Sequence, residues 1–221
     1  MSQAQWSAVD SYFNDLLVPH DAALEAALRA SKDAGLPPIN VSPSQGKLLH
    51  LVARLQGARK ILEIGTLGGY STIWLARALP EDGQLVTLEA VAKHAKVAQA
   101  NIVNAGLQDI VEIRLGAALD TLPKLAEEGK GPFDLTFIDA DKERIAEYFR
   151  WALELSHPGS VVIVDNVVRS GAVADAATVD PDVKGVRRFL ELLASEPRVT
   201  STAVQTVGSK GWDGFTLALI N

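Results

Sequence analysis

Two apolar segments of the chain end abruptly in side chains that carry oxygen. One runs into Asp139, with Lys142 three residues later, and the other runs into Asp165 and Asn166. If these segments are neighbouring parallel strands, their carboxyl ends meet at one edge of a sheet and bring the three oxygen donors together. Two carboxylates and an amide suit Mg²⁺, Ca²⁺ or Mn²⁺ rather than a soft metal. A nearby divalent cation disfavours the protonated amine, so Lys142 is placed to accept a proton.

A glycine-rich turn follows the first predicted strand, in the segment Glu63-Ile64-Gly65-Thr66-Leu67-Gly68-Gly69-Tyr70-Ser71. Its spacing differs from the G-x-G-x-x-G pattern of dinucleotide-binding proteins. Glu63 would repel a pyrophosphate but could receive an ammonium group, directly or through water. Glu89 ends the second predicted strand, where a carboxylate commonly binds the two hydroxyls of a ribose. An adenosine that carries an amino acid instead of phosphates fits both carboxylates, and S-adenosylmethionine is such a ligand.

The composition excludes several classes of function. The 221 residues include 48% hydrophobic and 22% charged residues, which suits one domain with a sizeable core. A formal charge of −6 disfavours a nucleic-acid partner. The chain has no cysteine, which excludes disulfides, zinc–thiolate sites and cysteine nucleophiles. Because we find neither a signal-peptide pattern nor a long apolar run, we expect a cytoplasmic protein with no membrane partner.

From residue 60 onward, short apolar segments alternate with segments of helical periodicity. This alternation predicts an α/β fold with a Rossmann-like, doubly wound and mostly parallel sheet. The predicted strands are Lys60–Ile64, Leu85–Glu89, Val111–Leu115, Leu135–Ile138 and Val161–Val164. The predicted helices are Ser71–Ala78, Val91–Asn104, Ala117–Glu127, Glu143–Leu155 and Asp182–Ala194. Two β-rich runs, Val199–Val207 and Gly214–Ile220, predict a C-terminal hairpin, so one strand of the sheet should run antiparallel.

The N-terminal region is predicted to be helical. Apolar spacing predicts a helix over Trp6–Lys32, which the segment Gly35-Leu36-Pro37-Pro38 ends. Ser42 and Pro43 predict the start of another helix, through about Leu55. We expect residues 1–221 to form a single domain, in which the helices at about residues 3–56 cover the active site or pack on a twin subunit.

Three motifs together resemble the cation-dependent O-methyltransferases, a family that includes the catechol and caffeoyl-coenzyme A enzymes and many bacterial relatives. The motifs are Glu63-Ile64-Gly65-x-x-Gly68-x-Tyr70-Ser71, Asp139-Ala140-Asp141-Lys142 and Asp165-Asn166. The resemblance runs from about Ile39 to the C-terminus. It implies the class I methyltransferase fold, a seven-stranded sheet with a reversed last strand. It also implies S-adenosylmethionine as methyl donor, a vicinal dihydroxy aromatic as acceptor, and a homodimer.

The resemblance assigns roles to individual residues. Asp139, Asp165 and Asn166 are expected to bind the divalent cation, and Lys142 to act as general base beside Asp139. The residues expected to contact S-adenosylmethionine are Val41, Glu63, Gly65, Thr66, Tyr70, Ser71, Glu89, Ala118 and Asp139. Two segments depart from the plant enzymes: Ser44-Gln45-Gly46, and the loop after Asn166, which lacks the tryptophan frequent there. Both shape the acceptor pocket, so the identity of the phenolic acceptor stays open.

Other functions share parts of this pattern. An NAD(P)-linked oxidoreductase shares the alternation of strands and helices, but Glu63 opposes its phosphates. A methyltransferase acting on nitrogen or RNA shares the cofactor, but the acidic charge and the oxygen donors oppose it. A protein that binds the cofactor without catalysis is disfavoured by the presence of Lys142. Among the three aspartates, Asp141 is the one that best suits a simple role in capping the helix or loop that follows. We therefore predict a cation-dependent transfer of a methyl group from S-adenosylmethionine to a hydroxyl of a catechol-type small molecule.

Overall fold

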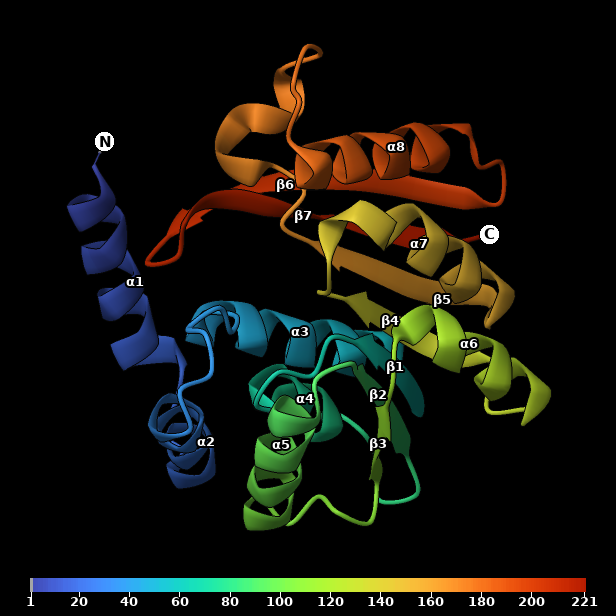
Figure 1. Cartoon of the computed structure of the whole chain (residues 1–221). Helices are drawn as coiled ribbons and strands as arrows, with labels where there is room; N and C mark the ends of the chain where they lie inside the picture. The colour runs from blue at the N-terminus through green and yellow to red at the C-terminus, as the bar shows by residue number, and fades with distance from the viewer. Residues whose placement is uncertain (1) are drawn as a thin grey trace.

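The computed structural model describes residues 2–221 of the chain. Seven strands form one sheet in the order β3-β2-β1-β4-β5-β7-β6 (Figure 1). The strands are β1 (Lys60–Ile64), β2 (Gln84–Glu89), β3 (Val111–Leu115), β4 (Phe133–Ile138), β5 (Ser156–Asp165), β6 (Val199–Gly208) and β7 (Gly211–Ile220). The first five pair in parallel, and β7 pairs antiparallel with both β5 and β6. The predicted doubly wound α/β fold with one reversed strand is confirmed.

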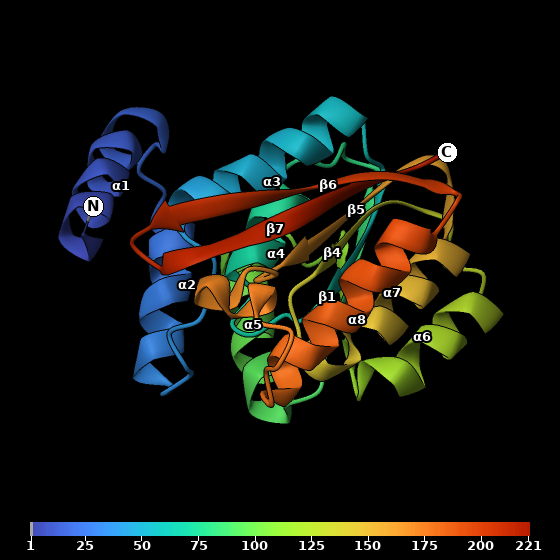
Figure 2. The same cartoon turned by 90° about the horizontal axis from the view of Figure 1, so that it is seen from above.

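Helices cover both faces of this sheet (Figure 2). One face carries α3 (Pro43–Gln56), α4 (Tyr70–Ala76) and α5 (Ala92–Asn104), and the other carries α6 (Ala118–Glu127), α7 (Ile145–Glu154) and α8 (Pro181–Ser195). Ile61 of β1 joins the core beneath α3–α5, while its neighbour Leu62 joins the core beneath α6–α8. Both are fully buried, which is why the strand is a continuous apolar run. Among residues 2–221, no helix is long and apolar enough to cross a membrane.

The N-terminal region differs from the single helix predicted over Trp6–Lys32. It forms two helices, α1 (Gln3–Leu17) and α2 (Ala22–Asp33). Pro19 disfavours helical backbone at the residue before it. Asp21 then caps α2, because its carboxylate accepts hydrogen bonds from two backbone amides of the first turn. The apolar periodicity continues across the break, so it could not reveal the change of direction.

The β6–β7 hairpin forms the last two strands, with β6 at the edge of the sheet. β7 begins at Gly211 rather than at the predicted Gly214 and pairs with β6 up to Gly208. The tip of the hairpin reaches α1 at the side of the molecule (Figure 1). There the Gln3 amide donates a hydrogen bond to the Gly208 carbonyl (2.8 Å), so α1 is attached to the hairpin by polar contacts.

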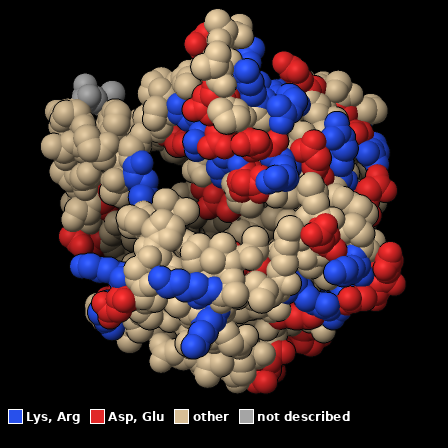
Figure 3. Space-filling model, in the orientation of Figure 1, with Lys and Arg blue, Asp and Glu red and all other residues tan. Residues whose placement is uncertain are grey.

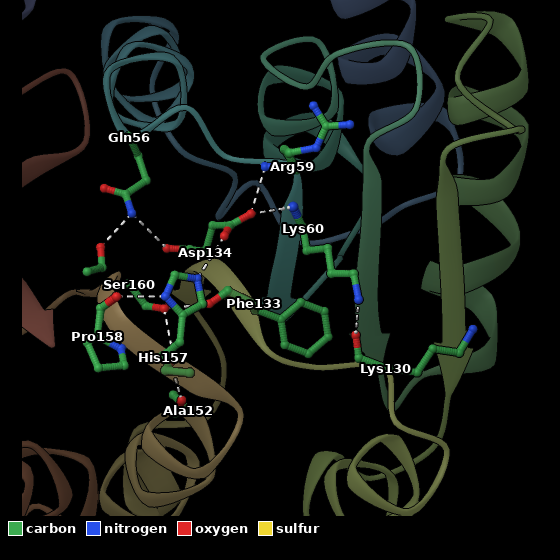
Figure 4. A network of polar contacts seen from close by, with 12 residues as sticks. Gln56, Arg59, Lys60, Lys130, Phe133, Asp134, Ala152, His157, Pro158 and Ser160 are labelled. Carbon is green, nitrogen blue, oxygen red and sulfur yellow. Dashed lines mark hydrogen bonds and ion pairs between the residues drawn. The ribbon is translucent and has the colours of Figure 1, made fainter.

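Asp134 links the starting ends of three strands (Figure 4). Its Oδ2 accepts hydrogen bonds from the backbone amides of Arg59 (2.7 Å) and Lys60 (2.8 Å), and its Oδ1 lies 2.9 Å from His157 Nε2. His157 belongs to β5, which the sequence predicted to begin only at Val161. The pairing of β4 with β5 is irregular at this point, with a register shift between Phe133 and Leu135. The link holds β1, β4 and β5 together at the end opposite their carboxyl ends.

Candidate active site

A cavity of about 640 Å³ lies at the carboxyl ends of the parallel strands. Ligands bind at this edge in open α/β sheets, and the volume is typical of a small-molecule site. The predicted residues that line it are Val41, Gly65, Thr66, Tyr70, Ser71, Glu89, Ala118, Asp139, Lys142 and Asn166. Glu63 and Asp165, also predicted, are buried and are not among the residues that line the cavity.

The glycine turn connects β1 to α4 along one wall of this cavity. Gly65 follows β1 with a φ of +105°, a conformation that L side chains rarely adopt. Gly69 precedes α4 with a φ of +82°, and the helix then presents Tyr70 and Ser71 to the cavity. The turn therefore brings bare backbone and the start of a helix to the place where a ligand would lie.

Glu89 at the end of β2 is held by two backbone amides. Its Oε2 accepts a hydrogen bond from Leu67 N (2.8 Å), and its Oε1 accepts one from Val91 N (2.9 Å). These bonds fix the carboxylate at the cavity and leave lone pairs on both oxygens for a ligand. His94 of α5 also lines the cavity, with Nδ1 3.5 Å from Oε1 of Glu89. The sequence assigned His94 no role, because no metal-ligand or catalytic spacing marks it.

Glu63 lies beneath the glycine turn in a network of hydroxyl groups. Its Oε1 accepts a hydrogen bond from Ser71 Oγ (2.7 Å), and its Oε2 accepts bonds from Thr72 and Thr87 (2.7 Å for Thr87). Burial raises the pKa of Glu63 to about 7, although the three hydroxyl donors favour its ionised form. The predicted contact of Glu63 with the cofactor stays a prediction, and Ser71 is the residue that connects this carboxylate to the cavity.

Asp139 and Asp165 lie side by side, because β4 and β5 pair in a register that sets Ile138 opposite Val164. Lys142 Nζ donates to Asp139 Oδ1 at 3.0 Å, and its side chain is only 7% exposed. The structure therefore brings together the two carboxylates and the amine that the sequence singled out.

The carboxylate of Asp165 is held at both oxygens. Its Oδ2 accepts a hydrogen bond from Gln45 Nε2 (2.7 Å), and its Oδ1 accepts one from the Asn166 backbone (2.9 Å). Burial, and then the negative charge of Asp139, raise the pKa of Asp165 to about 7. A divalent cation would relieve this repulsion, so two carboxylates with the Asn166 amide fit a hard cation. Within residues 2–221 no three His, Cys, Asp or Glu side chains gather as a metal site. Asn166 lines the cavity, and its amide is the third donor that the sequence predicted.

Side chains that the sequence analysis missed line the same cavity. Tyr148 of α7 donates a hydrogen bond to Asp141, and Arg169 pairs with Asp182 at 3.1 Å. Asp213 of β7 holds the loop that follows Asn166, since its Oδ1 accepts a hydrogen bond from the backbone amide of Arg169 (3.1 Å). Tyr148, Arg169, Asp182 and Asp213 come from four elements distant in sequence, and no motif marks them.

The sheet order, the glycine turn after β1, Glu89 at the end of β2 and the oxygen donors after β4 and β5 define an S-adenosylmethionine-dependent methyltransferase. Residues 18–220 match the O-methyltransferase family. The chain belongs to this family, the catechol and caffeoyl-coenzyme A type that the motifs predicted.

Individual relatives agree over the whole length of the chain. It is 53% identical to a catechol O-methyltransferase of Niastella koreensis over 220 residues, which is 100% of both chains. It is also 53% identical to a catechol O-methyltransferase of Mycobacterium tuberculosis, covering 96% of this chain and 94% of that one.

Solved structures give the same result. The O-methyltransferase from Bacillus cereus in complex with SAH matches with a TM-score of 0.98 and 56% identity, covering 100% of both chains. TomG from Streptomyces achromogenes, an O-methyltransferase of tomaymycin synthesis in complex with SAM, matches with a TM-score of 0.97 and 56% identity, covering 100% of this chain and 99% of that one. These comparisons decide against the oxidoreductase alternative and favour oxygen as the methyl acceptor.

Proposed function

We propose that this enzyme transfers the methyl group of S-adenosylmethionine to one hydroxyl of a catechol-type small molecule, with a divalent cation such as Mg²⁺, Ca²⁺ or Mn²⁺ bound. The observation that carries the proposal is the meeting of Asp139, Asp165 and Lys142 beside the cavity. The similarity to two catechol O-methyltransferases over nearly their whole length supports a vicinal dihydroxy aromatic acceptor.

The cavity offers a matching group for each part of the donor. Glu89 would accept the two ribose hydroxyls, because its orientation is already fixed by backbone amides. Ala118, at the start of α6, would contact the adenine ring. Gly65 would let the backbone approach the methionine part, and Ser71 would link its ammonium group to Glu63. Val41, Thr66 and Tyr70 would complete the walls.

Lys142 would act as the general base. Asp139, Asp165 and Asn166 would hold the cation through their oxygens, and such a cation lowers the pKa of adjacent phenolic hydroxyls and orients the acceptor. Lys142 Nζ lies 3.0 Å from Asp139 Oδ1, at the place where the acceptor would bind, and would take the proton of the attacking hydroxyl. The phenolic oxygen then bonds to the methyl carbon as the carbon–sulfur bond breaks, and S-adenosylhomocysteine leaves. Alignment of such a pair can lower the barrier by about 7–11 kcal/mol.

Methyl transfer measured on catechols and on matched monophenols tests the proposal. We expect EDTA to abolish transfer to catechols and Mg²⁺ to restore it, while monophenols stay unmethylated. Full activity in EDTA would refute the cation, whereas equal activity on monophenols would refute the catechol acceptor.

The proposal includes a homodimer, in which α1 of one copy packs on α3 of the other. α1 has no buried residue, and it carries an exposed apolar stripe made up of Val9, Tyr12, Phe13, Leu16 and Leu17. α3 exposes Leu48, Leu51 and Leu55 on one face. Apolar stripes of this extent are typical of protein interfaces.

Charge supports this pairing of helices. α1 carries Asp10 and Asp15 and no basic residue, while α3 carries Lys47 and Arg54 and no acidic residue. Figure 3 shows that charged side chains are sparse over α1 and dense over the region of α7 and α8. In a two-fold dimer the same contact occurs twice, so an acidic helix meets a basic helix at both places.

A further inference from the structure

We infer that Gln45 is a positioning residue for the carboxylate of Asp165, and that it sets the affinity of the enzyme for its divalent cation. The inference rests on the cation dependence proposed above. Gln45 lies in the first turn of α3, 120 residues before Asp165 in the sequence, and its Nε2 donates to Asp165 Oδ2 at 2.7 Å. Among residues 2–221, Gln45 is the side chain that holds this buried carboxylate from outside β5, and the other bond comes from the adjacent Asn166 backbone.

The first turn of α3 is itself held in place on both sides. Ser42 caps the helix by accepting the Gln45 backbone amide (3.2 Å). Gly46 packs so tightly on Trp74 of α4 that a Cβ atom would lie 2.3 Å from the indole ring. On the other side, Ser44 Oγ donates to Asn14 Oδ1 of α1 (2.8 Å). Gln45 therefore reaches Asp165 from a rigid support, which a positioning residue requires.

A neutral amide suits this position better than a charged group. Asp139 already has a cationic partner in Lys142. A second cationic side chain at position 45 would cancel the remaining charge of the carboxylate pair, while a glutamate would add a third carboxylate against Asp165. Gln45 supplies one N–H donor and no net charge. It thus restricts Asp165 to one orientation and leaves the attraction for a divalent cation intact.

Binding of Mn²⁺ to the purified full-length enzyme tests this role without any measurement of activity. Electron paramagnetic resonance of free Mn²⁺ gives the dissociation constant, and calorimetry gives the affinity for S-adenosylmethionine in EDTA. The substitution Gln45→Met keeps the length of the side chain and removes the amide. We expect it to weaken Mn²⁺ binding about 10- to 100-fold, the usual effect of removing a group that holds a metal ligand. The affinity for S-adenosylmethionine should change less than twofold.

Gln56→Met is the matched control. Gln56 lies in the last turn of the same helix and donates to the Gly159 carbonyl (2.6 Å), at the other end of β5. The Gln56→Met variant should bind Mn²⁺ with the dissociation constant of the wild-type enzyme. Equal weakening in both variants would indicate a general loosening of α3 and overturn the inference, and so would wild-type binding by Gln45→Met. If the wild-type enzyme binds no Mn²⁺, the proposed cation dependence fails as well.

Discussion

The backbone of Gly65 passes so close to the carbonyl oxygen of Asp139 that a Cβ atom at position 65 would lie 2.1 Å from it. The glycine turn after β1 and the acidic tip after β4 therefore belong to one structural feature. Their close approach places the wall of the cavity beside the predicted cation site, so a shift of either segment would displace the other. Gly65 also has a φ of +105°, so two separate constraints select glycine here.

Gly65→Ala should therefore damage both the fold and the binding of the donor. The added methyl group meets backbone rather than a flexible side chain, so β1 or β4 must shift. We expect the midpoint of thermal unfolding to fall and the dissociation constant for S-adenosylmethionine, measured by calorimetry, to rise at least tenfold. Gly57→Ala is the control, because Gly57 has a φ of +67° and no neighbouring atom within 4 Å of the added Cβ. It should show only the cost of the backbone conformation, about 1–2 kcal/mol, with unchanged donor binding.

Lys142→Met should separate catalysis from binding. The substitution keeps the aliphatic stem that packs beside Asp139 and removes the amine that would accept the proton. We expect the turnover number for a catechol to fall about 10²- to 10⁴-fold, the usual contribution of a general base. The dissociation constant for S-adenosylmethionine should stay within about twofold of wild type. Lys130→Met, which removes an ion pair with Glu112, should leave turnover unchanged. A parallel loss of turnover and donor binding in Lys142→Met would indicate a structural role.

The sequence predicted the features that follow from short-range pattern and parallel topology. Asp139 and Asp165 could be placed together because parallel strands end at the same edge of the sheet. Glu89 could be placed at the cavity for the same reason. The division of the N-terminal helix is marked locally by Pro19 and by the capping residue Asp21, which the apolar periodicity does not register. Gln45 and Arg169 could not be predicted from short-range pattern or topology. Their positions depend on how whole helices and loops pack over the sheet edge, which no local periodicity records.

The buried Glu63 should make stability fall as the pH rises. Burial raises its pKa from 4.5 to about 7, so the folded state binds this proton more tightly than the unfolded state does. The stability that protonated Glu63 contributes is fully present below pH 4.5 and is lost as the pH rises through about 7, a change of about 3 kcal/mol. Urea unfolding at about pH 5, 6 and 7 gives the slope of the unfolding free energy against pH. This slope should be less steep in Glu63→Gln than in the wild type, by up to about 1.4 kcal/mol per pH unit. The slope should be unchanged in Glu127→Gln, since Glu127 is exposed. Identical slopes in wild type and Glu63→Gln would show that Glu63 does not titrate in this range.

A charge exchange between α1 and α3 should control dimerisation. Asp15→Arg alone and Arg54→Asp alone each place like charges at both contacts of the proposed two-fold dimer, so each should weaken the dimer about tenfold, within the range of exposed ion pairs. A mixture of the two variants should recover the dimer, because each variant then meets its opposite charge in the other. Light scattering during size-exclusion chromatography measures the oligomeric state of each single variant and of their mixture. A wild-type monomer, or single variants that dimerise normally, would contradict the proposed interface.

The pair formed by His157 and Asp134 should give a second dependence of stability on pH. The hydrogen bond that His157 donates to Asp134, and then the one to the Pro158 carbonyl, raise the pKa of His157 above 6.5. Burial alone would raise the pKa of Asp134, but the bonds from His157 and the amides of Arg59 and Lys60 lower it overall.

Protonated His157 therefore contributes stability that is fully present below pH 6.5 and is lost as the pH rises through its raised pKa. His157 is partly exposed, so we expect less than about 1 kcal/mol from this pair. Urea unfolding of His157→Gln should show no such loss as the pH rises above 6.5. Asp134→Ala should be less stable than His157→Gln at every pH, because it also leaves the backbone amides of Arg59 and Lys60 without their acceptor. If the two variants are equally stable, the link between the strand starts depends on His157 and not on the amides that Asp134 binds.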